Sequence, residues 1–167
     1  MQAVRLIALS SLLLTAVIGV YLYALVTPVK APDVAFKTTD GNTMAMHELR
    51  GSPVLVNFWA SDCPSCLREM PEMEKLYRRF SGRGLKIIGV AMHYDIPSRV
   101  MDLVRTGRIS YPVALDLRAE LASAFGEVTA VPNSFLIAPD GRIVFHKLGL
   151  PDMNALDRQI EELLLED

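Results

Sequence analysis

The 167-residue chain contains two cysteines, Cys63 and Cys66, separated by only two residues. A disulfide between them would close almost no loop, so it would contribute little as a structural cross-link. A structural zinc site needs about four ligands, and no second Cys/His pair stands at a suitable spacing. The spacing therefore favours a pair that alternates between dithiol and disulfide.

This pair stands where a buried strand is predicted to pass into a helix. Residues 53–59 form an apolar, β-branched run typical of a strand covered on both faces, and residues 64–80 carry apolar side chains at three-and-four spacing. Cys63 would lie at the helix N-terminus, where free N–H groups and the helix dipole favour a thiolate. Pro64 suits the first helical position. Cys63 is thus the expected nucleophile and Cys66, one turn on, the resolving thiol.

Strands and helices are predicted to alternate along the rest of the chain. A turn at Asp40-Gly41-Asn42 separates short extended pieces at 34–37 and 43–46. The further elements are strands at 85–92, 111–115, 134–138 and 142–147, and helices at 97–106, 118–125 and 152–165. This order predicts an α/β domain with a mixed central sheet and helices on both of its faces.

The N-terminal part of the chain is apolar. Residues 6–26 carry no charge, and a run of about 21 residues is long enough to span a bilayer as a helix. A cleavable signal peptide is the alternative, although its apolar region is typically about 7–15 residues. We predict a cytoplasmic segment at 1–5, a membrane anchor at 6–26, a tether at 27–32 and one domain at 33–167.

The net charge and the positions of the histidines limit the kinds of partner and cofactor that the protein is expected to bind. The chain has 17 basic and 19 acidic residues, whereas a nucleic-acid-binding domain usually carries a basic patch. His47, His93 and His146 have no metal-ligand spacing with one another. We therefore expect no nucleic acid, no metal and no cofactor beyond the cysteine pair itself.

Several short motifs occur in order along the part of the chain that follows the apolar segment. They are Ala31-Pro32-Asp33, Asp40-Gly41, Leu49-Arg50-Gly51, the run from Pro53 to Cys66, Glu69-Met70-Pro71 and Val131-Pro132. With this combination the chain resembles the membrane-anchored thiol–disulfide oxidoreductases of the TlpA/ResA type. The resemblance implies a thioredoxin-like fold with an N-terminal β-hairpin and a central strand–helix insert, which residues 111–125 would supply.

The resemblance also implies roles for residues outside the cysteine pair. Glu69, which alone would be taken for a solvated surface carboxylate, looks like the family's active-site acid, exchanging a proton with Cys66. Pro132 would be a cis proline lying against the cysteines, although trans is the commoner state. The backbone of Val131 would then pair with a substrate strand.

Some positions near the cysteines depart from the family pattern, and others are candidates for contact with the substrate. Asn57 stands where thioredoxin has a buried Asp, and Asn133-Ser134 replaces a more usual Thr. Asp62 precedes Cys63 where Trp is usual; it either opposes thiolate formation or is an exposed turn residue. The candidate substrate contacts are Val131, Trp59, Asp62, Pro64 and Ser65, of which Trp59 is expected rather to pack beside the site.

The expected function is the reduction of disulfides in partner proteins outside the cytoplasm. The resemblance implies location at the bacterial cytoplasmic membrane, clients such as apocytochrome c or other envelope proteins, and a membrane electron donor that relays reductant from cytoplasmic thioredoxin. Two alternatives stay open. One is a disulfide-forming oxidant; the other is a copper-binding assembly factor for a respiratory oxidase, against which the two-residue cysteine spacing argues.

Overall fold

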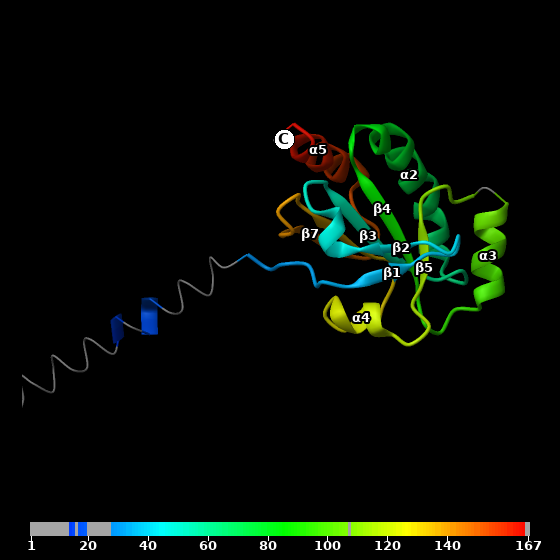
Figure 1. Ribbon diagram of the computed structural model, residues 1–167, viewed down its shortest axis with the longest axis horizontal. Coiled ribbons are helices and arrows are strands. Elements are labelled where there is room, and N and C mark those ends of the chain that lie inside the picture. Colours follow the sequence, from blue (N-terminus) through cyan, green and yellow to red (C-terminus); the bar gives the residue numbers. More distant parts are fainter. Residues whose placement is uncertain (1–13, 16, 20–27, 107, 166–167) are drawn as a thin grey trace, which may run out of the picture.

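The computed structural model describes residues 14–15, 17–19, 28–106 and 108–165 (Figure 1). Among these residues, no helix has both the length and the apolar character required to cross a membrane. Apart from 14–15 and 17–19, the predicted cytoplasmic segment and anchor lie outside the described residues. The anchor therefore stays a prediction.

A five-stranded mixed sheet forms the centre of the domain, with strand order β5-β4-β3-β6-β7 (Figure 1). Its strands are β3 (Val54–Trp59), β4 (Lys86–Ala91), β5 (Val113–Leu115), β6 (Asn133–Ile137) and β7 (Ile143–Leu148). The first three are parallel to one another, and β6 and β7 are antiparallel to their neighbours. Every residue of β3 is buried, as its continuous apolar run predicts.

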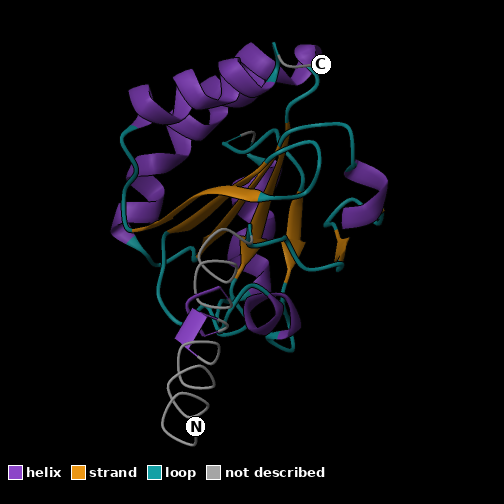
Figure 2. Ribbon diagram, turned by 90° about the vertical axis from the view of Figure 1, so that its left-hand side faces the viewer, coloured by secondary structure: helices purple, strands orange, loops and turns teal. Residues whose placement is uncertain are grey.

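Helices cover both faces of this sheet, as predicted (Figure 2). One core joins the sheet to α2 (Pro64–Phe80), α3 (Pro97–Arg105) and α5 (Met153–Leu163). The opposite core joins it to α4 (Glu120–Ala124) and to the separate hairpin of β1 (Ala35–Lys37) and β2 (Thr43–Ala45). Two short 3-10 helices, η1 (Met46–Leu49) and η2 (Ser81–Arg83), have no counterpart in the predicted elements.

Successive side chains of β3 alternate between the two cores. Leu55 and Trp59 pack on the side of α2, whereas Val56 and Phe58 pack on the side of the hairpin. By this alternation Asn57 points toward α2. A buried polar side chain is thereby placed beneath the helix that carries the cysteines.

The segment predicted as a tether is partly bound to the domain. The carbonyl oxygen of Val29 accepts a hydrogen bond from the amide of Ile143 (2.8 Å), and the amide of Ala31 donates to the carbonyl of Gly141 (2.9 Å). Ala31 is buried in the hairpin-side core. The start of β7, which would otherwise expose edge hydrogen-bonding groups, is thus covered by residues 29–31.

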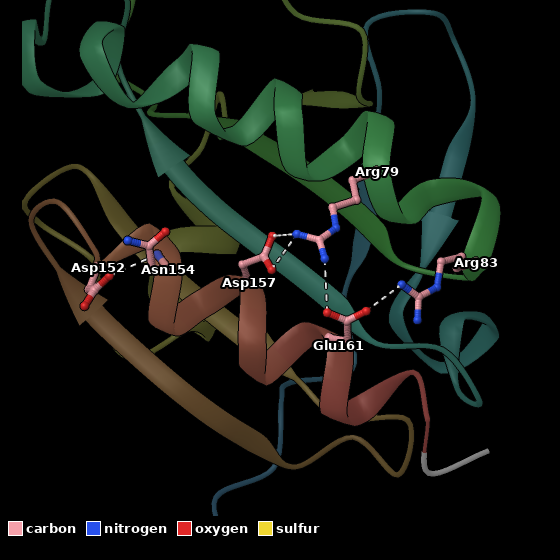
Figure 3. A network of polar contacts seen from close by, with 6 residues as sticks. All are labelled: Arg79, Arg83, Asp152, Asn154, Asp157 and Glu161. Atoms are coloured by element: carbon pink, nitrogen blue, oxygen red, sulfur yellow. Dashed lines mark hydrogen bonds and ion pairs between the residues drawn. The ribbon is translucent and has the colours of Figure 1, made fainter.

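Ion pairs connect the C-terminal part of α2 and the following η2 to α5 (Figure 3). Arg79 contacts Asp157 (2.7 Å) and Glu161 (3.1 Å), and Arg83 contacts Glu161 (3.0 Å). The α5 helix begins with a capping residue, Asp152, whose side chain accepts hydrogen bonds from two backbone amides. These contacts hold α5 against the helix that bears the candidate site.

Candidate active site

Cys63 and Cys66 form a disulfide at the point where the sheet meets α2, with their Cα atoms 5.3 Å apart. Cys63 is the N-cap residue of α2, and Pro64 follows it at the first helical position, exposed to solvent. Cys63 is half-buried, whereas Cys66 is only 3% exposed. The sulfur that an incoming partner can reach is therefore that of Cys63.

Polar groups surround the Cys63 sulfur. The backbone amide of Cys66 donates to it at 3.2 Å, and the Ser65 hydroxyl lies at the same distance. The carbonyl oxygen of Val131 lies 3.8 Å away. In the reduced protein the amide and the hydroxyl are suited to stabilise a thiolate at the helix N-terminus.

The loop facing the disulfide contains the one cis peptide bond of the described residues, between Val131 and Pro132. This is the isomer that the resemblance implies. Pro132 is buried and Val131 half-buried, directly before β6. The carbonyl group that contacts Cys63 therefore belongs to the loop that leads directly into β6.

Glu69 lies in the interior, on the same helix face as Cys66, and is 4% exposed. Its Oε1 atom accepts hydrogen bonds from Asn57 Nδ2 (3.4 Å) and Ser134 Oγ (3.5 Å), and Asn57 Nδ2 also donates to Ser134 Oγ (2.9 Å). Within the described part of the chain, Oε2 has no hydrogen-bond partner. Burial raises the pKa of Glu69 to about 7, outweighing the lowering effect of these two donors. The alternative of a solvated surface carboxylate is wrong.

Trp59 is only 1% exposed, so it packs beside the site as expected, and its place among the candidate substrate contacts is wrong. It packs between the sheet and α2, and its indole nitrogen has no partner among the described residues. Gly89 on β4 allows this packing: a Cβ there would lie 3.0 Å from Trp59 Nε1 and 3.0 Å from Tyr111 Cε2. Burial, followed by the charges of Glu69 and Glu74, raises the pKa of Tyr111 and keeps its hydroxyl neutral.

Asp95 holds the loop before the cysteines, a role that sequence reasoning missed. Its carboxylate accepts hydrogen bonds from the Ser61 amide and hydroxyl, both at 2.6 Å, and from the Ile96 amide at 2.7 Å. Asp62, next along this loop, is exposed. Burial, and then the charges of Asp62 and Asp95, raise the pKa of Tyr94. The only sequence signal for Asp95 is its place just before a proline-led helix.

Sequence reasoning noted Asn57 and Ser134 only as departures from a pattern, yet the structure brings both to Glu69. The histidines are exposed and belong to different parts of the fold. His146 stacks on Phe135 with ring centroids 4.2 Å apart. In the described residues, no three His, Cys, Asp or Glu side chains are grouped so as to hold a metal ion.

The AhpC/TSA family model matches residues 28–146, the stretch that contains the disulfide, Glu69 and the cis proline. The chain belongs to the AhpC/TSA family. Within it, the chain is 30% identical over 114 residues to the thiol-disulfide oxidoreductase ResA of Bacillus subtilis, a match covering 68% of this chain and 63% of that protein. The ResA of Bacillus thuringiensis subsp. konkukian is 30% identical over 135 residues, 80% of this chain and 76% of the relative. These relatives confirm the resemblance to the ResA type.

Solved structures of the same fold agree with this family assignment. A thiol:disulfide interchange protein from Chlorobium tepidum superposes with a TM-score of 0.75 at 30% identity, over 83% of this chain and 97% of that one. MTB DsbF gives a TM-score of 0.71 at 25% identity, over 82% and 99% of the two chains. The AhpC/TSA member described here thus has a thioredoxin-like fold, and it is a thiol–disulfide oxidoreductase whose CxxC pair is Cys63 and Cys66.

Proposed function

We propose that the protein acts as a reductase of disulfides in client proteins outside the cytoplasm, held at the membrane by its apolar N-terminal segment. One observation carries the proposal: a half-buried Cys63 at a helix N-terminus is backed by a buried Cys66 and a buried Glu69. This asymmetry suits one thiol that attacks and a second that resolves.

The reaction begins with the dithiol form. The Cys63 thiolate attacks one sulfur of the client disulfide, forming a mixed disulfide and releasing the other client sulfur as a thiolate, which takes a proton. Cys66 then loses its proton and attacks Cys63 Sγ. The client leaves with two thiols, and the protein keeps the Cys63–Cys66 disulfide, having given up two electrons and two protons.

Glu69 is the group suited to handle the Cys66 proton. Its pKa of about 7 lies near a neutral working pH, so the carboxylate form can accept a proton and the carboxylic acid form can return one. Asn57 and Ser134 donate long hydrogen bonds to its Oε1 atom and leave its Oε2 atom without a partner among the described residues. Since Asn57 itself does not ionise, Glu69 is the ionisable group of this cluster.

The apolar N-terminal sequence and the redox chemistry support the proposed extracytoplasmic setting. Surroundings outside the cytoplasm are oxidising, so a reductase there must be recharged after each cycle by a donor of two electrons. A membrane protein that relays reductant from cytoplasmic thioredoxin would supply them. Clients such as apocytochrome c, whose cysteines must stay reduced, fit this chemistry.

Trapping of mixed disulfides tests the proposal. In a Cys66→Ala variant the resolving thiol is absent, so client proteins should accumulate on Cys63 in cells. Cys63→Ala and the double variant serve as matched controls and should trap nothing. Failure of Cys66→Ala to trap any partner would contradict the reductase role.

The reduction potential tests the direction of electron flow. Equilibration of the purified protein with glutathione or dithiothreitol buffers should give a potential near the thioredoxin range, about −270 mV, rather than near that of a strong oxidant, about −120 mV. A value at the oxidant end would replace the proposal with disulfide formation.

A further inference from the structure

Two neighbouring hollows lie along α2, and Ser61 and Leu67, close in sequence to the two cysteines, are among the residues that line them. One, of about 440 Å³, is bounded by α2 and Arg108, and the other, of about 340 Å³, by α3, Ser61 and Arg108. Leu67 and Arg108 border both hollows. We refer to the surface formed by α2 residues 67–78, by residues 99–105 of α3 with its C-cap Thr106, and by Arg108 as the α2 groove.

The α2 part of this groove is a single stripe of the helix. Leu67, Met70, Pro71, Glu74, Lys75 and Arg78 line it, at the three-and-four spacing that places residues on one helix face. The stripe begins close to the reacting sulfurs, because Leu67 is one turn from Cys63 and its amide donates to the Cys63 carbonyl at 3.1 Å. From Leu67 to Arg78 it extends about 16 Å at 1.5 Å per residue, the length of about five extended residues.

The floor of the groove near the disulfide is apolar. Leu67 is 38% exposed, although it stands beside the buried Cys66 and Met70 on α2. An apolar side chain this open, at one end of an elongated hollow, is suited to contact an apolar side chain of a bound segment. The opposite end of the hollow carries Lys75 and Arg78.

The charge around the groove is positive. Four cations, Lys75, Arg78, Arg99 and Arg108, border it, against two carboxylates. Both carboxylates are paired, Glu74 with Arg78 and Asp102 with Arg105. Lys75 is likewise paired, with Glu72, so the uncompensated positive charge of the groove comes from Arg99 and Arg108. Among the described residues, neither Arg99 nor Arg108 is paired with a carboxylate.

We propose that the α2 groove docks an extended segment of the client polypeptide, with an apolar side chain against Leu67 and carboxylates toward Arg108. The inference rests on the proposed reductase function and names its preferred client chemistry. Because the chain as a whole carries a net charge of −2, this local positive surface selects acidic segments rather than reflecting the overall charge. The segment's cysteine would then lie over Cys63.

Short peptides test the docking chemistry. Each peptide carries one central cysteine, joined by a mixed disulfide to thionitrobenzoate, and one leucine. The other residues are glutamates in one peptide, glutamines in the second and lysines in the third. Each peptide is made with the leucine before the cysteine and with the leucine after it. Attack by the reduced protein releases coloured thionitrobenzoate, directly or when Cys66 resolves the adduct. Single-turnover rates at low salt should be about tenfold higher for the glutamate peptide than for the glutamine peptide in the favoured order.

Charge reversal in the groove provides the decisive comparison. Arg108→Glu should abolish or invert the preference for glutamate. Arg158→Glu, at an exposed position of α5, makes the same change in net charge away from the groove and should leave the preference within about twofold. Salt at about 1 M should remove the preference in the unaltered protein, since screening then acts within about 3 Å.

The inference would be overturned by the absence of a glutamate preference in the unaltered protein, by equal effects of the two charge reversals, or by a preference that survives high salt. Preference for the glutamine peptide would identify an apolar ligand site instead, and would also overturn it. Hydroxyethyl disulfide, which is small and uncharged, separates the two proposals. The two charge-reversal variants should reduce it at the same rate as the unaltered protein, and failure of the unaltered protein to reduce it would count against the reductase function.

Discussion

At the scale of single residues, Glu69 shows how burial and hydrogen bonding compete for one carboxyl group. Its two donors stand at 3.4 and 3.5 Å, at the long end of hydrogen-bond distances, where each contact is weak. Desolvation therefore dominates and raises the pKa of Glu69 to about 7. A carboxyl group that would be fully charged in water is thus divided between two protonation states at neutral pH.

The raised pKa of Glu69 predicts a loss of stability with rising pH. The folded protein binds the Glu69 proton more tightly than the unfolded chain, whose pKa is 4.5. The free energy of unfolding of the oxidised protein should therefore fall as pH rises from about 4.5 to about 7, by roughly 3 kcal/mol from this group. Glu69→Gln should remove that part of the slope in denaturant titrations between these pH values.

An exposed carboxylate provides the control for this measurement. Glu162→Gln on the surface of α5 should leave the slope of the unaltered protein in place. If the two variants gave the same pH dependence, Glu69 would not carry the raised pKa.

Sequence reasoning found the reacting residues but not the partners that tune them. Two cysteines at this spacing before an apolar helix already specify the redox pair. By contrast, the placement of Ser134 beside Glu69 depends on the register of β6 against β3, which pairs Ser134 with Asn57. Because β3 and β6 are distant in sequence and share no turn, the alternation of each strand indicates which side chains face the core but does not say which residue of β6 pairs with Asn57. The bond from Asp95 to Ser61 joins loops 34 residues apart and was missed for the same reason.

At the scale of secondary structure, the long elements follow from local pattern and the short ones less so. The helix predicted at 64–80 has those bounds in the structure, because its apolar periodicity and its N-terminal proline both mark it. The helix predicted at 118–125 is shorter, Glu120–Ala124. It begins after Ala119 in a left-handed conformation (φ 58°), which local propensity does not predict.

Gly89 on β4 leaves room for two aromatic rings because it has no side chain. A Cβ there would be 3.0 Å from the Trp59 indole and 3.0 Å from the Tyr111 ring, both of them buried in the core on the α2 side. Gly89→Ala should lower the free energy of unfolding by about 1–3 kcal/mol through overpacking, measured by chemical denaturation.

Gly82 supplies the matched control for this substitution. A Cβ at Gly82 would meet no atom within 4 Å, so Gly82→Ala should change stability by less than about 0.5 kcal/mol. A Gly89→Ala protein as stable as Gly82→Ala would show that the two rings move aside without cost.

At the scale of the whole molecule, the two ends of the sheet have different neighbours. The disulfide follows the C-terminal end of β3. Residues 29–31 bind beside Gly141 at the other end of the sheet, near the N-terminal end of β3, where Val54 pairs with Ile137, the last residue of β6. If the chain before residue 28 is anchored as we propose, Asp140 should lie nearer the bilayer than Asp62 does.

Fluorescence quenching can check this orientation. With the full-length protein in vesicles, a fluorescent amino acid at Asp140 should be quenched by headgroup-labelled lipids more strongly than one at Asp62; both positions are exposed. Equal quenching, or stronger quenching at Asp62, would contradict the orientation.

The pairing of Val29 with Ile143 also sets a standoff distance for the chemistry. The six residues of β3 separate the point of attachment from the disulfide by about 20 Å at 3.3 Å per residue. If the chain is anchored as we propose, this distance would hold Cys63 in solution above the bilayer, where it could meet a soluble client. A donor with thiols at the bilayer surface would then reach Cys63 only when the domain tilts toward the membrane, so oxidation by clients and recharging by the donor would require two different orientations of one tethered molecule.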